Sequence, residues 1–133
     1  MSTDDPTAFE RGQAMIREVY AGAVADIPKG LIPFNDVMIE TLFAEVWTRE
    51  ELSIRDRRLL IMGVIAAGGN IEVWKIQARA ALARGELSPA ELRETLITLA
   101  PYAGYPNVAG LVGEAEGLIA EHEREPATPS DAD

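Results

Sequence analysis

An unbroken apolar run from Leu59 to Gly69 (LLIMGVIAAGG) constrains this chain more than any other feature. The run is too short to span a bilayer, which needs about 20 apolar residues. It suits a helix that is apolar all round as far as Ala67 and is therefore buried on all sides. Ser53 predicts the start of this helix and Gly68-Gly69 its end. We therefore expect the other elements to pack around it.

Apolar residues at helical spacing predict five further helices. Residues Ser88 to Glu91 (SPAE) are the strongest local signal, because serine can cap the helix, proline suits its first position and glutamate can return the capping bond. Asn35 and Asn70 are further predicted caps, and Gly85 is a predicted helix end. The six predicted helices cover about residues 7–23, 36–48, 54–67, 71–84, a segment from 89 that Pro101 kinks or ends early, and 107–123.

These patterns predict an all-α protein, a compact bundle of about six helices, because no stretch alternates as a strand does. The length of 133 residues suits one domain, which we expect over residues 7–125. Residues 1–6 and the acidic tail 126–133 are expected to be disordered.

The charge and the residue types exclude several classes of function. The net charge of −10 disfavours binding to nucleic acid. With no cysteine, the chain cannot form disulfides, thiolate metal sites or thiol redox centres. The single histidine, His122, is expected on the surface, so we expect no metal site and no cofactor. With neither a secretory leader nor a membrane span in the sequence, we expect no membrane partner and a cytoplasmic location.

Three polar residues, Glu45, Gln77 and Thr98, fall on or beside predicted apolar faces. The pattern alone favours structural roles for them: an ion pair with Arg49, an interhelical hydrogen bond and a bond to the residue's own helix, respectively. A role in a site is the alternative, since a buried polar group without a partner costs about 1–3 kcal/mol.

Three arginines, Arg55, Arg57 and Arg58, open a predicted helix, where positive charge opposes the helix dipole. Salt bridges are the favoured interpretation for Arg55 and Arg58. For Arg57, capture of a substrate carboxylate by the forked guanidinium is equally well supported.

Several motifs follow one another in a consistent order and resemble the carboxymuconolactone decarboxylase family from Leu42 to Leu111. They are Glu45-Val46-Trp47-Thr48-Arg49, Leu52 with Arg55, Arg57, Leu59 and Leu60, Ala80-Ala81-Leu82 with Gly85, Glu91 to Leu96, and Tyr102-Ala103-Gly104-Tyr105-Pro106. The segment from Arg11-Gly12 to Val19 also resembles the start of the decarboxylases proper.

This resemblance implies an alkylhydroperoxidase-D-like helical fold and assembly as a trimer or hexamer. One branch of the family removes CO2 from a carboxylated butenolide in aromatic-acid breakdown, and its histidines align with Gln77 and Thr98. The peroxidase branch carries a Cys-x-x-Cys motif and a histidine, where this chain has Asn70, Val73 and Gln77. The family's glutamate is kept as Glu45.

The resemblance therefore implies a cofactor-independent lyase or isomerase that acts on a small cyclic or keto carboxylate. Gln77 can donate a hydrogen bond but cannot titrate, so Glu45 would have to supply the proton. We expect these two side chains to meet at an apolar pocket in a homo-oligomer. The expected site residues are Glu45 and Gln77 as catalytic groups, with Arg57, Thr98, Tyr102 and Trp74 binding the substrate.

Two other functions remain as alternatives. The first is a catalytically silent, oligomeric member of the family that binds a small ligand or a partner, which the lost histidine favours. The second is an antioxidant peroxidase, which the missing cysteines disfavour.

We predict that the protein does not reduce hydroperoxides with any dithiol, because a turnover cycle needs a peroxidatic sulfur and a resolving thiol. Peroxide consumption with dithiothreitol should equal that of a heat-treated sample. Consumption well above this control would contradict the prediction.

Overall fold

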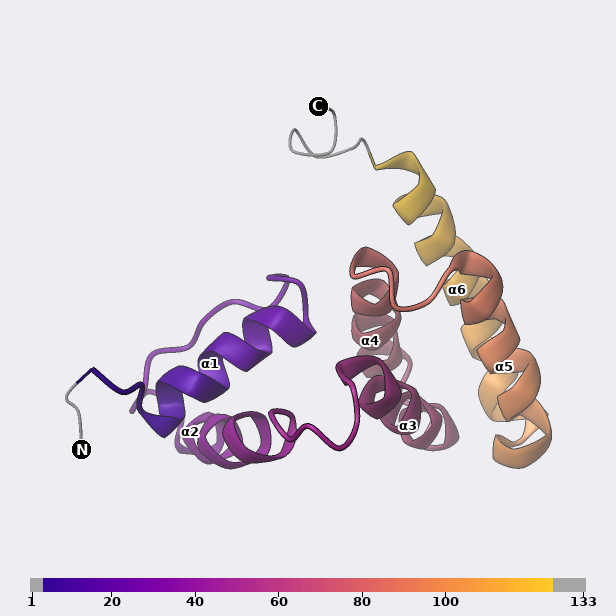
Figure 1. The fold of residues 1–133 in the computed structure, drawn as a ribbon. Helices are drawn as coiled ribbons and strands as arrows, with labels where there is room; N and C mark the ends of the chain where they lie inside the picture. The colour runs from indigo at the N-terminus through magenta and orange to yellow at the C-terminus, as the bar shows by residue number, and fades with distance from the viewer. Residues whose placement is uncertain (1–3, 126–133) are drawn as a thin grey trace. The chain divides into compact units, whose positions relative to one another are not determined.

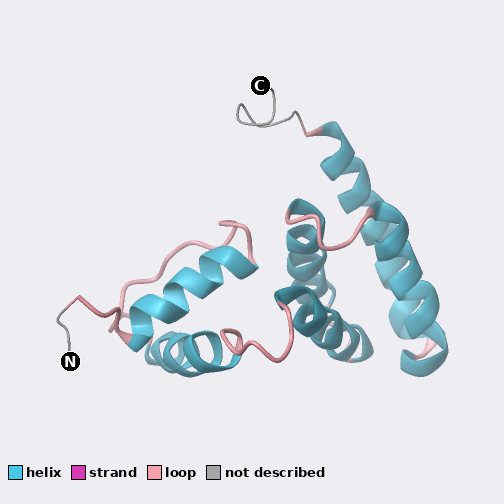
Figure 2. Cartoon of the chain, in the orientation of Figure 1, coloured by secondary structure: helices cyan, strands magenta, loops and turns pink. Residues whose placement is uncertain are grey.

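The computed structural model describes residues 4–125, and this part of the chain is helical with no strand (Figures 1 and 2). The predicted all-α fold with six α-helices is confirmed for these residues. The elements are α1 (Ala8–Val19), α2 (Pro33–Met38), the π-helix η1 (Ile39–Val46), α3 (Ile54–Ala67), α4 (Ile71–Ala83), α5 (Pro89–Ala103) and α6 (Tyr105–Arg124).

The chain divides into two compact units, with the boundary inside α3. Unit 1 comprises the residues up to 58, and unit 2 comprises those from 59 onward. The single domain expected over residues 7–125 stays a prediction. The predicted tail 126–133 and the first three residues lie outside the described part. No helix within that part combines the length and apolar character that a bilayer crossing needs.

In unit 1, α1 packs against η1 at Gly12. A Cβ atom on Gly12 would lie only 2.0 Å from the carbonyl oxygen of Ile39, so the two backbones meet where no side chain fits. Phe43 and Trp47 are buried in this unit, and their rings stack with centroids 6.1 Å apart. Gly12 thus sets how closely the two helices approach.

The first helix ends at Val19, short of the predicted end near residue 23. Ala21 and Gly22 take left-handed backbone angles, with φ of +53° and +77°, which stop the helix. The buried Arg58 donates a hydrogen bond from Nη2 to the carbonyl oxygen of Val19. A cation at a helix C-terminus is favourable, so Arg58 both caps α1 and ties it to the start of α3.

Asp26 fixes the segment that follows α1 to that helix through hydrogen bonds. The Nε atom of Arg17 lies 3.2 Å from Asp26 Oδ1, and Gln13 Nε2 donates to the same oxygen at 2.8 Å. The hydrogen bond from Arg17 is the main cause that lowers the pKa of Asp26. This carboxylate therefore stabilises the fold above its unfolded pKa, and the contribution is lost as the pH falls through the folded pKa.

The predicted N-cap at Asn35 is wrong, because the helix begins earlier, with Pro33 in its first turn. The N–H of Asn35 donates to the carbonyl of Ile32 at 3.0 Å and so already belongs to that turn. From Ile39 the chain continues as a π-helix, whose last bond joins the N–H of Trp47 to the carbonyl of Leu42 at 3.0 Å.

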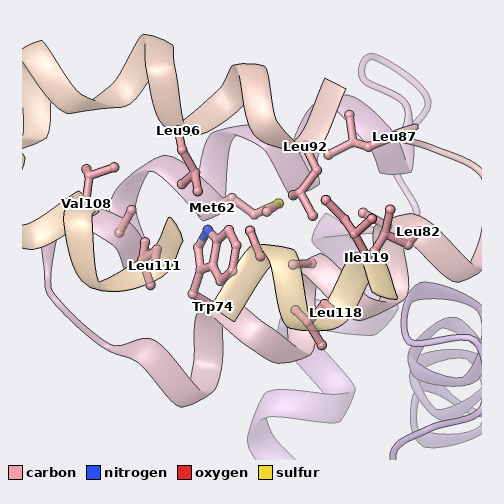
Figure 3. Packing of buried hydrophobic residues seen from close by; sticks show 14 of the residues in the cluster. Met62, Trp74, Leu82, Leu87, Leu92, Leu96, Val108, Leu111, Leu118 and Ile119 are labelled. Carbon is pink, nitrogen blue, oxygen red and sulfur yellow. The ribbon is translucent and has the colours of Figure 1, made fainter. Parts of the chain in front are cut away.

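Unit 2 has its own core, formed where α6 packs on both α4 and α5 and completed by α3 (Figure 3). The predicted caps are confirmed. Ser88 and Glu91 exchange capping bonds of 3.1 and 2.9 Å, and Asn70 Oδ1 accepts from the N–H of Val73 at 3.1 Å. The largest fully buried apolar side chains of this core are Trp74, Met62, Leu92, Leu111 and Ile119.

Three details of unit 2 differ from the predictions. Leu60 and Val64, one turn apart on α3, are 62% and 73% exposed, so this helix is not buried on all sides within one chain. Helix α5 continues past Pro101 to Ala103, so it does not end early at the proline, while the predicted kink stays a prediction. Helix α6 begins at Tyr105 instead of residue 107, since the left-handed Gly104 alone makes the turn.

We expect Gly12→Ala to destabilise unit 1 by about 1–3 kcal/mol or more, because the new methyl group would overlap the Ile39 carbonyl oxygen. Gly113→Ala is the matched control: this helical glycine has open space around its Cβ position, and alanine there should stabilise by about 0.5–1 kcal/mol. Urea unfolding would measure both. A Gly12→Ala protein as stable as the wild type would contradict the close approach.

Candidate functional site

Two of the predicted site residues flank the turn between η1 and α3 in unit 1. Glu45 lies in the last turn of η1 with its side chain exposed, and Arg57 lies in the first turn of α3, half-buried. The Nη2 atom of Arg57 donates to the carbonyl oxygen of Arg49 at 2.9 Å. Arg49 lies three residues after the end of η1, so this bond anchors the guanidinium on the turn that follows the helix of Glu45.

Arg57 retains an unused hydrogen-bond donor. Its Nε atom is buried and has no partner among the described residues. An unpaired buried donor is costly, and a guanidinium binds a carboxylate through two parallel bonds that neutral partners cannot match. The Nε atom itself is closed to solvent, but the half-buried guanidinium as a whole suits recognition of a carboxylate.

The π-helical form of η1 is itself notable at this position. Such helices are rare and occur frequently at functional sites, because the wider turn shifts the side chains that follow. Here the π-helix carries Glu45. No residue pattern in the sequence distinguishes this segment from an ordinary α-helix, so this feature was not predicted.

In unit 2, the other predicted residues fall into two groups. Gln77 and Trp74 lie inside, 3% and 0% exposed, one turn apart on α4. Trp74 packs in the core with its indole Nε1 buried and without a hydrogen-bond partner among the described residues (Figure 3). Thr98 and Tyr102 are both exposed, and their spacing of four residues places them on one face of α5.

The candidate residues thus belong to both units, with Glu45 and Arg57 in unit 1 and the other four in unit 2. The contact between Glu45 and Gln77 stays a prediction, as do the substrate contacts of Thr98, Tyr102 and Trp74. The role of Arg58 as a cap of α1 was missed. The sequence did carry a signal for this role, because an arginine near the start of a helix opposes the helix dipole, but that signal was interpreted as a salt bridge.

Comparison with known proteins adds the family. The sequence profile of the "Carboxymuconolactone decarboxylase family" matches residues 33–117, a range that includes all six candidate residues. No curated protein matches the chain significantly.

We predict that Trp74 and Tyr102, two aromatic candidates, contribute very differently to the free energy of unfolding. Trp74→Ala should lower the free energy of unfolding by about 3–5 kcal/mol, because it empties the centre of the unit 2 core. Tyr102→Ala should change it by less than about 0.5 kcal/mol, because the side chain is 91% exposed. Chemical denaturation followed by circular dichroism tests both. Equal effects would contradict the assignment of Trp74 to the core.

Proposed function

Because the chain belongs to the carboxymuconolactone decarboxylase family, we propose that it is a cofactor-independent lyase or isomerase of a small cyclic or keto carboxylate. The observation that carries this proposal is the guanidinium of Arg57. It is anchored on the turn after η1, is half-buried there, and carries a charge suited to a carboxylate. The π-helix that holds Glu45 ends at the same turn.

The proposed reaction is loss of CO2 from a carbon next to a vinylogous lactone. The bond to the departing carboxylate breaks, its electron pair forms an enolate, and a proton then adds to carbon. The enolate oxygen needs a hydrogen-bond donor, for which we propose the Gln77 amide. Glu45 supplies the proton, and Arg57 binds a carboxylate that the reaction retains.

The replacement of the family's histidine by Gln77 sets a condition on this mechanism. An amide is neither a general acid nor a general base near neutral pH, so Glu45 must transfer the proton alone. Glu45 is exposed in the single chain, whereas burial is what favours the protonated form of a carboxyl group that has to donate a proton. The proposal therefore requires the bound substrate or a second copy of the chain to cover Glu45.

The alternative is a catalytically silent member of the family that binds a carboxylate or a partner. The lost histidine and the exposure of Glu45 favour it. In that case Arg57 has the same role in binding, but Glu45 has none in proton transfer.

We also propose that the protein is a cytoplasmic homo-oligomer, either a trimer or a hexamer. Support comes from large apolar side chains that are more than half exposed in the described part of the chain, since soluble monomers seldom expose many. Examples are Phe34, Leu60, Val64 and Ile97, at 62–76% exposure.

The test of the proposed reaction is CO2 release from a carboxylated butenolide by the wild type and by two variants. Glu45→Gln should lower kcat by about 100-fold or more, because it removes the proposed proton donor. Glu51→Gln is the matched control, with the same charge change at an exposed residue before α3, and should keep full activity.

Calorimetric titration with the same compound separates the two functions. Binding without turnover, lost in Arg57→Ala and unchanged in Glu45→Gln, would establish the silent alternative. Neither turnover nor binding across a panel of cyclic and keto carboxylates would contradict both.

A further inference from the structure

Helices α5 and α6 of unit 2 enclose an apolar groove of about 400 Å³ that none of the predicted site residues lines. Its inner wall is continuous with the core of the unit, and its rim carries apolar side chains that face solvent. The inner wall comprises Leu96, Ala100, Val108 and Ala115. The rim comprises Ile97, Tyr105 and Val112, which are 66%, 68% and 49% exposed.

Among the described residues that line this groove, Arg93 and Glu116 are the charged ones, and they neutralise each other. Arg93 Nε and Nη2 donate to the two carboxylate oxygens of Glu116 at 2.8 and 2.9 Å. The hydrogen bond from Arg93 is the main cause that lowers the pKa of Glu116, so the pair stays ionised at neutral pH. The lining of the groove is therefore balanced in charge on a chain whose net charge is −10, and Glu123 acts on Arg93 from outside that lining.

These features favour one occupant. A strongly charged partner gains nothing from a face without net charge, and a small ligand in the groove would leave the rim in water. Two acidic copies repel each other least where their charges are already compensated. The face also offers both shapes that a self-complementary contact needs: large side chains at Ile97 and Val112, and small ones at Ala100 and Ala109.

We propose that the α5–α6 groove is a self-association surface on which the same face of a second copy docks. This inference rests on the self-association proposed above and specifies its surface. Because the same face is used on both copies, the contact is two-fold, with the rim side chains of each copy filling the groove of the other. A two-fold contact requires an even number of copies, so it fits the hexamer and not the trimer.

The first experiment measures the molar mass of the full chain by size-exclusion chromatography with light scattering. Ala109→Arg places a long cation at an exposed helical position inside the groove, so folding should be unaffected. Ala83→Arg is the matched control, with the same substitution at an exposed helical position outside it. We expect the mass of the Ala109→Arg assembly to fall to about half or less, and that of the control to equal the wild type.

The possible outcomes separate the surface from the oligomer. An Ala109→Arg protein with the wild-type mass would overturn the surface but leave the proposed self-association standing. A wild type that is monomeric at every concentration would overturn both. Native mass spectrometry that shows a small apolar molecule bound to each chain, with the assembly unchanged in Ala109→Arg, would assign the groove to a ligand and overturn the proposal.

The second experiment uses the absence of cysteine from the chain. A single cysteine at Val112, joined by a short bismaleimide, can link only to a second copy. We expect efficient cross-linked dimers from Val112→Cys and none above background from Ala83→Cys. Equal yields from the two variants would contradict a specific contact at the groove.

Discussion

The contact between the backbones of α1 and η1 at Gly12 is the constraint on which unit 1 depends. Because Gly12 has no side chain, α1 can lie against the carbonyl of Ile39, the first residue of η1. Helix α1 ends at Val19, just before the left-handed Ala21 and Gly22, and the Val19 carbonyl receives the hydrogen bond of the buried Arg58. The preceding residue, Arg57, donates a hydrogen bond to the carbonyl of Arg49. Contacts in unit 1 thus lead from Gly12 through the end of α1 to the two arginines in the first turn of α3.

Local signals in the sequence were sufficient to predict most of the helices. The caps at Ser88, Asn70 and Ser53 depend on bonds within three residues, so the sequence around them determines the outcome. The π-helix could not be predicted, because η1 is stabilised by packing on α1 and its residues also suit an α-helix. The start at Pro33 did have a signal, since proline suits the first helical position, but the cap was predicted at Asn35 instead. The sequence shows which segments are apolar, but it does not show what covers them, and this is why the exposure of Leu60 and Val64 was unforeseen.

The site could be predicted only in part. Glu45, Gln77 and Arg57 were predicted as site residues because they are polar or charged at unexpected positions of the helical pattern and because the family resemblance includes them. The anchoring of Arg57 on the Arg49 carbonyl depends on the geometry of a turn, which no spacing of residue types encodes. The groove between α5 and α6 was also hidden, because its wall residues have the ordinary periodicity of a core-facing helix.

The two tryptophans of the chain lie in different units: Trp47 is 5% exposed in unit 1, and Trp74 is fully buried in unit 2. Their surroundings also differ, since Trp47 stacks on Phe43, whereas Trp74 is enclosed mainly by aliphatic side chains. Indole fluorescence depends on such surroundings, so each unit carries its own optical reporter. Replacing one tryptophan by phenylalanine leaves the other to follow a single half of the molecule during refolding, and this can reveal whether the two halves fold together or one after the other.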